Sequence, residues 1–435
     1  MEKKTLFLFD TVALIIGIVV GVGIFKTPSI VAANTGSAYE FMFLWIAGGA
    51  ISLIGALCYA ELATTYPHSG GDYHYIGRAF GKNPAFLFAW SRMTVIQAGS
   101  IAMLAFVFGD YITRVLPLGP HSTSIYAVSS ILILTILNSI GIRQGKWTQN
   151  LLSTVKILGL LIIFFAGIIS PHQSVPLLYP EQPRISIGLA MIFVLLTYGG
   201  WNEAAYISAE LHDIKRSMVS SLVWSIGIIT AIYLLLNLVF IKILGMTAMA
   251  QSETIASDVM NRIAGPSGAG LISAFIGVSA LGAMNATIIT GARTNFALGR
   301  EYLIFRYMGR WNENAGTPVI ALLVQAVISL FLVLLGTVTR KGFVTIVEYT
   351  APVFWLFFLL ATLSLIVLRV KEPEAVRPFT VPLYPFTPLF FSAVCLFMLV
   401  SSIQYTGIGA FAGLAVFLAG VPFLAGSAYL NAKAR

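Results

Sequence analysis

The sequence predicts an all-α integral membrane protein, and three observations lead to that class. Hydrophobic residues make up 58% of the 435-residue chain and charged residues only 10%, whereas about a quarter of the residues in a soluble domain are charged. Apolar runs of roughly 20 residues, the length that a helix needs to cross a bilayer, recur along the whole chain. The alternation of apolar and polar residues typical of membrane β-barrels is absent.

About twelve membrane spans follow from these apolar runs. We expect them at residues 10–33, 40–65, 84–112, 123–141, 148–169, 185–210, 217–244, 266–298, 317–337, 343–369, 385–404 and 407–429. The connections between them are too short to hold a separate soluble domain. Cys58 and Cys395 fall inside spans and are expected to be buried apolar residues rather than a disulfide.

The net charge of +9 is explained by membrane topology rather than by nucleic-acid binding. With the N-terminus placed inside, the inner connections carry most of the 26 lysines and arginines. Cytoplasmic loops are enriched in these two residues. The sequence therefore predicts a multi-pass protein of the cell (plasma) membrane, embedded in the lipid bilayer, with both termini in the cytoplasm.

The first span, residues 10–33, is interrupted by glycines at Gly17, Gly21 and Gly23. Glycine weakens a helix, and non-helical backbone at membrane depth is tolerated only where it is buried in protein or lines a cavity. An opened helix presents N–H groups in one direction and C=O groups in the other. We therefore expect the break to recognise a molecule that carries a carboxylate and an ammonium group together.

A second interruption, Gly199-Gly200, lies in the sixth span. Glycine breaks at corresponding positions of two halves indicate a transporter built from inverted repeats. The repeats would be 1–170 (spans 1–5) and 185–369 (spans 6–10), followed by 385–435 with two further spans. The alternative is that these glycines only permit close helix packing. The matching positions favour paired breaks.

Enzymatic chemistry has no support in the sequence. The five histidines fall in loops or at span ends, and no cluster has the spacing of zinc ligands. A phosphate-binding glycine loop that would couple the protein to ATP is also absent. We predict no catalytic residues, no metal and no cofactor.

Five segments, in the same order over nearly the whole chain, carry a resemblance to a known family. They are Gly21–Phe25 with Pro28, Leu57–Leu62 continuing to Gly81, Tyr198–Asn202 with Glu210, Asn285–Arg293, and Arg377–Leu383. Together they resemble the amino acid–polyamine–organocation (APC) superfamily, and within it the L-type amino acid transporters. The resemblance implies a LeuT-type fold of about twelve helices, in which a 5+5 inverted repeat carries two extra helices. It also implies alternating access and an amino acid substrate.

The resemblance places the substrate at the two breaks. The carboxylate would meet the backbone amides of Gly21, Val22 and Gly23, the ammonium would meet the carbonyls of Ile18, Leu196, Thr197 and Gly199, and the side chain would lie near Tyr198, Trp201 and Asn202. Many relatives have serine or alanine where this chain has Val22, so the carboxylate contact is expected to depend on backbone alone. The loop between spans 3 and 4 has no cysteine, which excludes a disulfide-linked accessory chain through this loop.

Lys156 lies within the fifth span, where a lysine costs about 3 kcal/mol on insertion scales and usually has a function. The resemblance gives it a role, because some sodium-independent relatives have a lysine in this helix where sodium-coupled ones hold a cation. Its ammonium would bridge the first break, at carbonyls near Gly17 to Gly21, and span 8, at the hydroxyl of Ser279. The alternative is a lysine whose ammonium reaches the cytoplasmic headgroups.

Several carboxylates also lie at the spans. Glu203 follows the second break and would take up a proton or select cationic substrates; alternatively, it only hydrogen-bonds to a neighbouring helix. Glu61 and Glu210 are expected to pair with basic residues such as Arg78 or Arg293 as a gate on the inner side, or as plain surface ion pairs. Two further charged residues in spans, Arg92 and Glu348, receive no role.

The leading functional hypothesis is a sodium-independent secondary transporter that exchanges or facilitates neutral L-amino acids. The alternatives are a proton-coupled symporter that uses Glu203 or Lys156, a transporter of cationic amino acids, and an amino acid sensor without flux.

Overall fold

The computed structural model describes residues 8–68, 70–141, 159, 161–170, 186–210, 214–339, 341–405 and 408–433. Within these residues the secondary structure is helical throughout, apart from an isolated β-bridge between Asn312 and Thr317. The all-helical class that the composition predicts is confirmed.

Ten helices in the described part of the chain are long and apolar enough to cross a membrane, and an eleventh span results if a bent pair is counted as one. The bent pair joins Thr11–Phe25 to Thr27–Ala33 at an angle of 54°. Most of the predicted fifth span, 148–169, including Lys156, lies outside the described residues.

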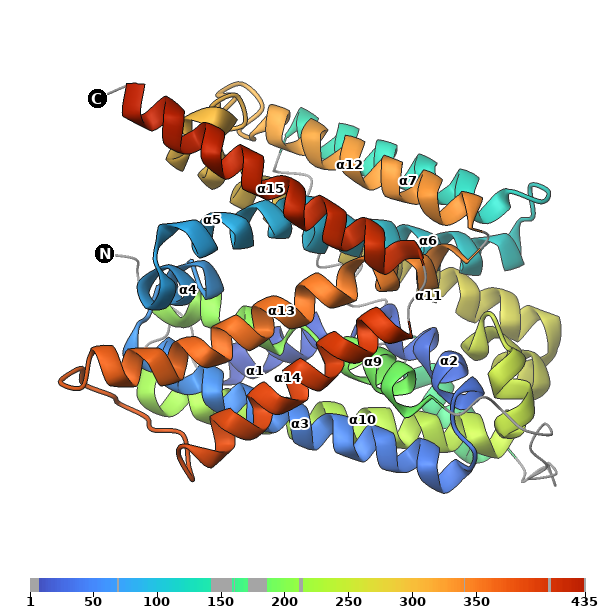
Figure 1. The fold of residues 1–435 in the computed structure, drawn as a ribbon. Helices are drawn as coiled ribbons and strands as arrows, with labels where there is room; N and C mark the ends of the chain where they lie inside the picture. Colours follow the sequence, from blue (N-terminus) through green and yellow to red (C-terminus); the bar gives the residue numbers. More distant parts are fainter. Residues whose placement is uncertain are drawn as a thin grey trace. The chain divides into compact units, whose positions relative to one another are not determined.

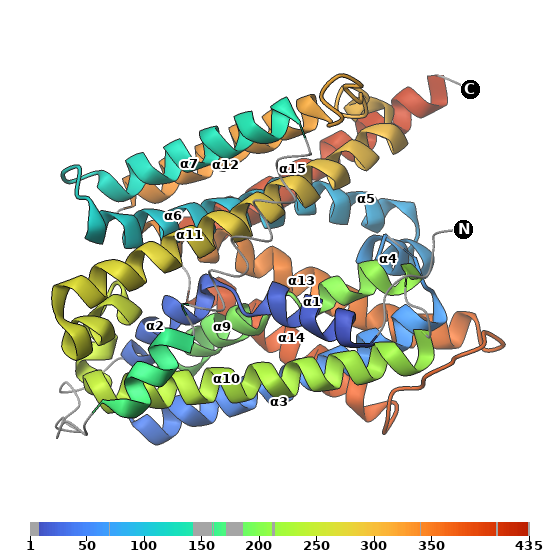
Figure 2. The ribbon, with the colours of Figure 1, turned by 180° about the vertical axis from the view of Figure 1, so that it is seen from behind.

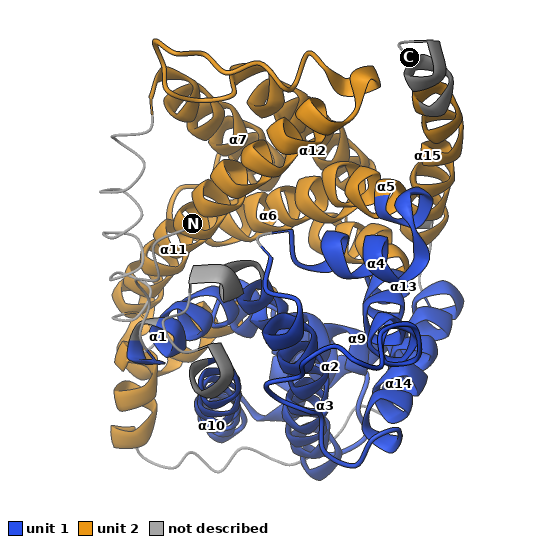
Figure 3. Ribbon diagram, turned by 90° about the vertical axis from the view of Figure 1, so that its left-hand side faces the viewer, with its two compact units in different colours: residues 1–85, 172–252, 354–405 blue, residues 86–171, 253–353, 406–435 orange. Residues whose placement is uncertain are grey.

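The chain divides into two compact units, coloured separately in Figure 3. Unit 1 comprises Met1–Ala85, His172–Ser252 and Phe354–Tyr405. Its elements are α1 (Leu8–Val19), η1 (Val22–Phe25), α2 (Thr27–Ala33), α3 (Ala38–Thr65), α4 (Asp72–Phe80), α9 (Ile187–Tyr198), η3 (Trp201–Glu210), α10 (Ile214–Gln251), the second part of α13 (Gly342–Lys371) and α14 (Phe386–Gln404). In this unit α10 packs against α1, α2 and α3, and α9 packs against α2, α3 and α14. Figure 1 shows α3 and α10 side by side.

Unit 2 comprises Phe86–Pro171, Glu253–Val353 and Thr406–Arg435. Its elements are most of α5 (Lys82–Ser91), the π-helix η2 (Arg92–Gln97), α6 (Ala98–Val115), α7 (Ser122–Ile140), α11 (Ile255–Glu301), η4 (Leu303–Phe305), α12 (Val319–Val338), the first part of α13 and α15 (Ile408–Lys433). The helix α6 packs against α7, α11 and α12, as Figure 2 shows from behind.

Local sequence explains where several of these helices begin and bend. Ser37 caps α3 by accepting a hydrogen bond from the backbone N–H of Glu40 (3.0 Å), and the Glu40 carboxylate accepts one from the N–H of Gly36 (2.7 Å). This arrangement resembles a capping box, shifted by one residue because Glu40 accepts from the N–H before the N-cap Ser37. The 47-residue helix α11 is bent at Gly265, directly before Pro266, because proline cannot donate the hydrogen bond that a continuous helix requires.

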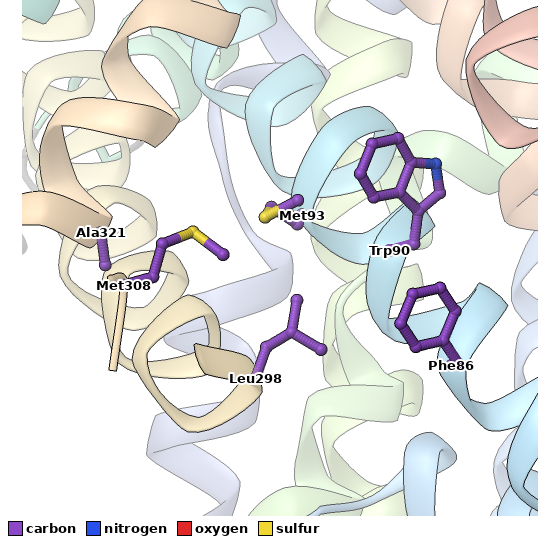
Figure 4. Packing of buried hydrophobic residues seen from close by; sticks show 6 residues of the cluster. All are labelled: Phe86, Trp90, Met93, Leu298, Met308 and Ala321. Carbon is purple, nitrogen blue, oxygen red and sulfur yellow. The ribbon is translucent and has the colours of Figure 1, made fainter. Parts of the chain in front are cut away.

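Both units have dense apolar cores. In unit 2 one such core joins α5, η2, α11 and α12 through the buried residues Phe86, Trp90, Met93, Leu298, Met308 and Ala321 (Figure 4). Cys58 and Cys395 are buried free thiols in unit 1, as the sequence predicts.

Candidate functional site

The first predicted interruption is present, and it is shorter than the glycine pattern suggests. The helix α1 ends at Val19, and the chain continues through Val20 and Gly21 into the short 3₁₀ helix η1. Gly21 has extended backbone geometry, and its N–H donates to the carbonyl of Val19 at 2.7 Å. Gly17 remains helical, so the break itself covers residues 20–26.

The second interruption is also present. The helix α9 ends at Tyr198, and after Gly199 and Gly200 the chain continues as the 3₁₀ helix η3. Gly200 has φ +109°, and a Cβ placed on it would lie 2.9 Å from Cγ2 of Ile18. A side chain at this position would therefore be strained in its backbone and would press on the first break.

The two breaks meet inside unit 1. A Cβ on Gly23 would be in contact with Cγ2 of Thr197 at 3.4 Å. The hydroxyls of Thr27 and Thr197 are 2.6 Å apart, joining the helix that follows the first break to the helix that precedes the second. The structure thus brings Ile18, near the end of α1, and Gly23 of the first break together with Thr197, near the end of α9, and Gly200 of the second break.

A tyrosine that the sequence analysis missed holds both breaks. The hydroxyl of Tyr233, in α10, lies 2.9 Å from the carbonyl oxygen of Val19 and 2.9 Å from that of Thr197. Its side chain is fully buried, so its one O–H is shared between the last carbonyl of α1 and a carbonyl at the end of α9. The signal in the sequence is weak: a single tyrosine in the aliphatic stretch Ala231–Leu234, where a buried hydroxyl needs a partner.

The aromatic side chains of the second break pack within unit 1. Tyr198 donates its hydroxyl to the carbonyl of Trp45 in α3 at 3.0 Å, and its ring lies 5.1 Å from that of Tyr233. Trp201 packs edge-on against Tyr59 at 5.2 Å, and its other aromatic contacts are on α13 and α14. Asn202 is buried. Both aromatic residues predicted to lie beside a ligand side chain thus have ring partners on neighbouring helices.

Some backbone groups at the breaks already have hydrogen-bond partners within the protein, and others do not need to have one within their helix. The carbonyl of Leu196 accepts from the N–H of Gly199 at 3.1 Å, and that of Thr197 accepts from Tyr233. A carbonyl oxygen has two lone pairs, so each can accept a further hydrogen bond. The amides of Val22 and Gly23 belong to the first turn of η1, where a helix has N–H groups without intrahelical acceptors and a positive partial charge. The backbone of the two breaks therefore offers both hydrogen-bond donors and hydrogen-bond acceptors to a ligand.

The predicted coupling residues are placed only in part. Lys156 lies outside the described residues. Ser279 is buried in α11 of unit 2, and its hydroxyl has no hydrogen-bond partner among the described residues. Glu203 is half-buried in the first turn of η3, and its backbone N–H donates to the carbonyl of Gly200 at 3.1 Å.

The carboxylate of Glu61 has a different partner from the one expected. It is buried at the end of α3 and accepts two hydrogen bonds from Arg369 of α13, from Nε at 2.7 Å and from Nη2 at 2.6 Å. The N–H of Val381 adds a third at 2.6 Å, and Nε of Arg377 lies 3.7 Å away. Glu61 thus has a basic partner as expected, but the partner is Arg369 at the end of α13, 308 positions further along the chain, rather than Arg78.

Arg78 pairs instead with Glu372, in a more exposed bidentate contact of 2.8 and 2.9 Å. Its guanidinium holds the pKa of Glu372 below its usual value. The side chain of Glu210 is outside the described part of the chain. Within that part, no group of three or more His, Cys, Asp or Glu side chains is arranged to hold a metal ion.

Comparisons with known proteins cover nearly the whole chain. Residues 6–424 match the family model described as Amino acid permease. The chain is 30% identical over 411 residues to the b(0,+)-type amino acid transporter 1 of Mus musculus, which covers 92% of this chain and 83% of the relative. It is 30% identical over 451 residues to the Large neutral amino acids transporter small subunit 2 of Homo sapiens, covering 99% of this chain and 82% of the relative.

Proposed function

The chain belongs to the amino acid permease family and is an amino acid transporter rather than an enzyme, and we propose that it carries neutral L-amino acids by alternating access, through exchange or facilitated passage without sodium. The observation that carries this proposal is the direct contact between the two helix breaks and the hydroxyl of Tyr233 that joins them. Both relatives are named as amino acid transporters, and the one named Large neutral amino acids transporter small subunit 2 agrees with the neutral class.

Recognition of the zwitterion would use backbone groups on both sides of the contact. The substrate carboxylate binds at the amides of Gly21, Val22 and Gly23, at the positive end of the helical segment that continues into α2. Since valine has no hydroxyl, the amides alone hold this group. Because this mode of binding needs no charged side chain of the protein, it favours amino acids whose own side chains are neutral.

The ammonium group binds on the opposite side, at carbonyls of Ile18, Leu196, Thr197 and Gly199. Tyr233 supports this assignment because it fixes the carbonyls of Val19 and Thr197 at one point. Broken helices that present N–H groups to an anionic group and carbonyls to a cation are the usual construction of midplane sites in such transporters.

The composition of the two units supports inverted repeats at 1–170 and 185–369 in a LeuT-type fold, with 385–435 appended. The first helices of each proposed repeat, α1–α3 and α9–α10, lie in unit 1. The middle helices of each, α6–α7 and α11–α12, lie in unit 2. Each unit is thus formed from equivalent parts of both repeats.

Lys156 would make transport independent of sodium, because its ammonium would take the place of a bound cation and lie against the hydroxyl of Ser279. The buried Ser279 hydroxyl, which lacks a partner among the described residues, supports this pairing. We also place the protein in the cell membrane with both termini in the cytoplasm, and without an accessory chain linked through 116–121, which has no cysteine.

Reconstitution into liposomes tests the mechanism. We expect uptake of a labelled neutral amino acid to rise when unlabelled amino acid is present inside, and to be unchanged by sodium. A strict requirement for sodium would contradict the role given to Lys156. Dependence on an inward proton gradient would favour symport through Glu203, and absence of flux for every amino acid would favour a sensor.

A substitution at the contact tests the site itself. Gly23→Leu places a branched side chain against Thr197 and should abolish binding of the amino acid. Gly227→Leu is the matched control, because a Cβ on Gly227, in α10 of the same unit, meets no atom within 4 Å. Normal binding by the Gly23 variant, or equal loss in the control, would remove the first break from the site.

A further inference from the structure

One end of unit 2 carries a surface of arginine and aromatic side chains that the proposed transport site does not use. Four arginines are exposed at the end of α11 and in the segment that leads to α12: Arg293, Arg300, Arg306 and Arg310. Tyr307 and Trp311 are exposed among them, at 52% and 38%. We call residues 293–311 the arginine–aromatic surface. The acidic residues of the connection are Glu301 and Glu313, so positive charge predominates.

The chain folds back to build this surface. The backbone of Gly309 lies directly on that of Gly299, and a Cβ on either glycine would collide with the backbone of the other. This crossing of two glycines brings the segment before Arg310 against the backbone of Arg300, although ten positions separate the two arginines. Hydrogen bonds from the N–H of Arg306 to Leu303 (3.2 Å) and from that of Gly309 to Arg306 (3.2 Å) hold the turn.

Buried side chains fix the base of the surface. Met308, between the exposed Tyr307 and Gly309, is 5% exposed and belongs to the apolar core with Leu298, Phe86 and Trp90 (Figure 4). Because Met308 is anchored inward, Tyr307 and the neighbouring arginines are presented outward on a rigid support.

Two positive charges meet at one ring. The guanidinium carbons of Arg306 and Arg310 lie 5.1 and 4.9 Å from the centroid of Tyr307, and Nη2 of Arg306 donates to the Tyr307 hydroxyl at 3.3 Å. These cations lower the pKa of Tyr307. Beside this pair, Phe296 packs edge-on against Trp311 at 5.3 Å. Two guanidinium groups held at the same ring present several N–H donors, and guanidinium groups match the oxygens of a phosphate group.

The position of the arginine–aromatic surface between two candidate membrane spans indicates a lipid headgroup as its ligand. The helices α11 and α12, which end at Glu301 and begin at Val319, are both candidate membrane spans, so the connection lies where membrane meets water. Exposed tyrosine and tryptophan favour that boundary. A cluster of arginines there attracts the anionic lipids of the cytoplasmic leaflet, and exposed Leu303 (45%) can contact acyl chains.

We propose that the arginine–aromatic surface binds the phosphate group of an anionic phospholipid. The guanidinium groups of Arg306 and Arg310 hold the phosphate, and Tyr307 and Trp311 lie at the level of the headgroup. This binding is separate from amino acid recognition, so it stands or falls independently of the transport proposal.

Native mass spectrometry of the purified full chain tests the lipid proposal. Delipidated protein is titrated with phosphatidylglycerol and, separately, with phosphatidylcholine. We expect tighter binding of phosphatidylglycerol, and an affinity about thirtyfold lower in the double variant Arg306→Gln/Arg310→Gln, since each arginine near a membrane surface contributes about 1 kcal/mol. Binding of phosphatidylcholine should be unchanged.

The matched control is Arg114→Gln/Lys341→Gln, which removes the same charge from two exposed residues of unit 2, one in the last turn of α6 and one just after α12. It should bind phosphatidylglycerol as the parent does. Equal binding of the two lipids, or equal loss in the control variant, would overturn the proposal. Displacement of phosphatidylglycerol by inorganic phosphate at similar concentration would identify a site for a soluble anion and would also overturn it.

Discussion

Replacing Tyr233 by phenylalanine removes one oxygen atom from the point where the two helix breaks meet. The ring keeps its packing against Trp45 and Tyr198, with centroids 5.7 and 5.1 Å away. The carbonyls of Val19 and Thr197 lose the donor that lies 2.9 Å from each. The change therefore tests the hydrogen bonds at the breaks with little change in shape.

The size of the effect follows from the burial of these groups. A buried acceptor left without its donor costs about 1–3 kcal/mol. Without this donor, the two break segments are expected to move so that their carbonyls find other hydrogen-bond donors. Part of the binding free energy of the substrate is then used to restore the binding geometry. Since affinity falls with the population of the competent state, the dissociation constant should rise by about 5–150-fold.

Direct binding of a labelled neutral amino acid to purified protein measures this change. Tyr198→Phe is the matched control for the loss of a buried hydroxyl, because the Tyr198 hydroxyl donates to the carbonyl of Trp45 in α3 at 3.0 Å rather than to a carbonyl of either break. It should lower thermal stability by a similar amount and leave affinity near that of the parent. If both variants bind equally well, or lose affinity equally, Tyr233 does not organise the site.

Three further outcomes follow from the geometry of unit 1. Gly200→Ala forces alanine into φ +109° and against Ile18, so it should destabilise the protein by about 1–3 kcal/mol and remove the thermal stabilisation that amino acid gives the parent; an unchanged ligand-induced shift would contradict this. Glu61→Gln leaves Arg369, whose side chain is 19% exposed, without its charge partner, so it should lower the free energy of unfolding in detergent by about 3–5 kcal/mol. Glu372→Gln removes the carboxylate of the more exposed pair and should lower it by under about 1 kcal/mol. Equal losses in the two variants would refute this contrast. Arg78 lowers the pKa of Glu372 in the folded protein. The pair therefore stabilises the fold at pH values above the carboxyl pKa of the unfolded chain, and this stabilisation is lost as the pH falls through the lower pKa of the folded protein. Comparing the stability of the parent and of Glu372→Gln across acidic pH measures this loss.

Local sequence was enough to predict the helix breaks. Gly21, Gly23, Gly199 and Gly200 interrupt apolar runs that would otherwise be continuous, and this signal depends only on neighbouring residues. Their equivalent positions in the two halves also predicted that they form a pair. The structure brings the breaks into contact.

The partners that hold the breaks were not predictable in the same way. Tyr233 and Thr197 are 36 positions apart, and Glu61 and Arg369 are 308 apart, so each pairing depends on how helices pack. The sequence of a uniformly apolar helix also does not show which neighbouring helix a given side chain faces. The hydrogen bond from the Tyr198 hydroxyl to the carbonyl of Trp45 is an example, because nothing in the sequence near either residue indicates it.

Recognition through backbone has a consequence for pH. The amides and carbonyls of the two breaks do not titrate, and the hydroxyl of Tyr233 acts as a neutral donor between two carbonyls. Affinity for a neutral amino acid should therefore be constant over the pH range in which the substrate stays zwitterionic, and equilibrium binding from mildly acidic to mildly alkaline pH measures this.

A dependence on pH would mean that a side chain takes part, and Glu203 is the candidate carboxylate because it lies in the first turn after Gly200. Glu203→Gln separates the possibilities. If binding and uptake are flat with pH in the parent and in this variant, the site binds the zwitterion through backbone alone and exchange needs no proton. If the parent depends on pH and the variant does not, Glu203 exchanges a proton during transport, and backbone recognition is only part of the mechanism.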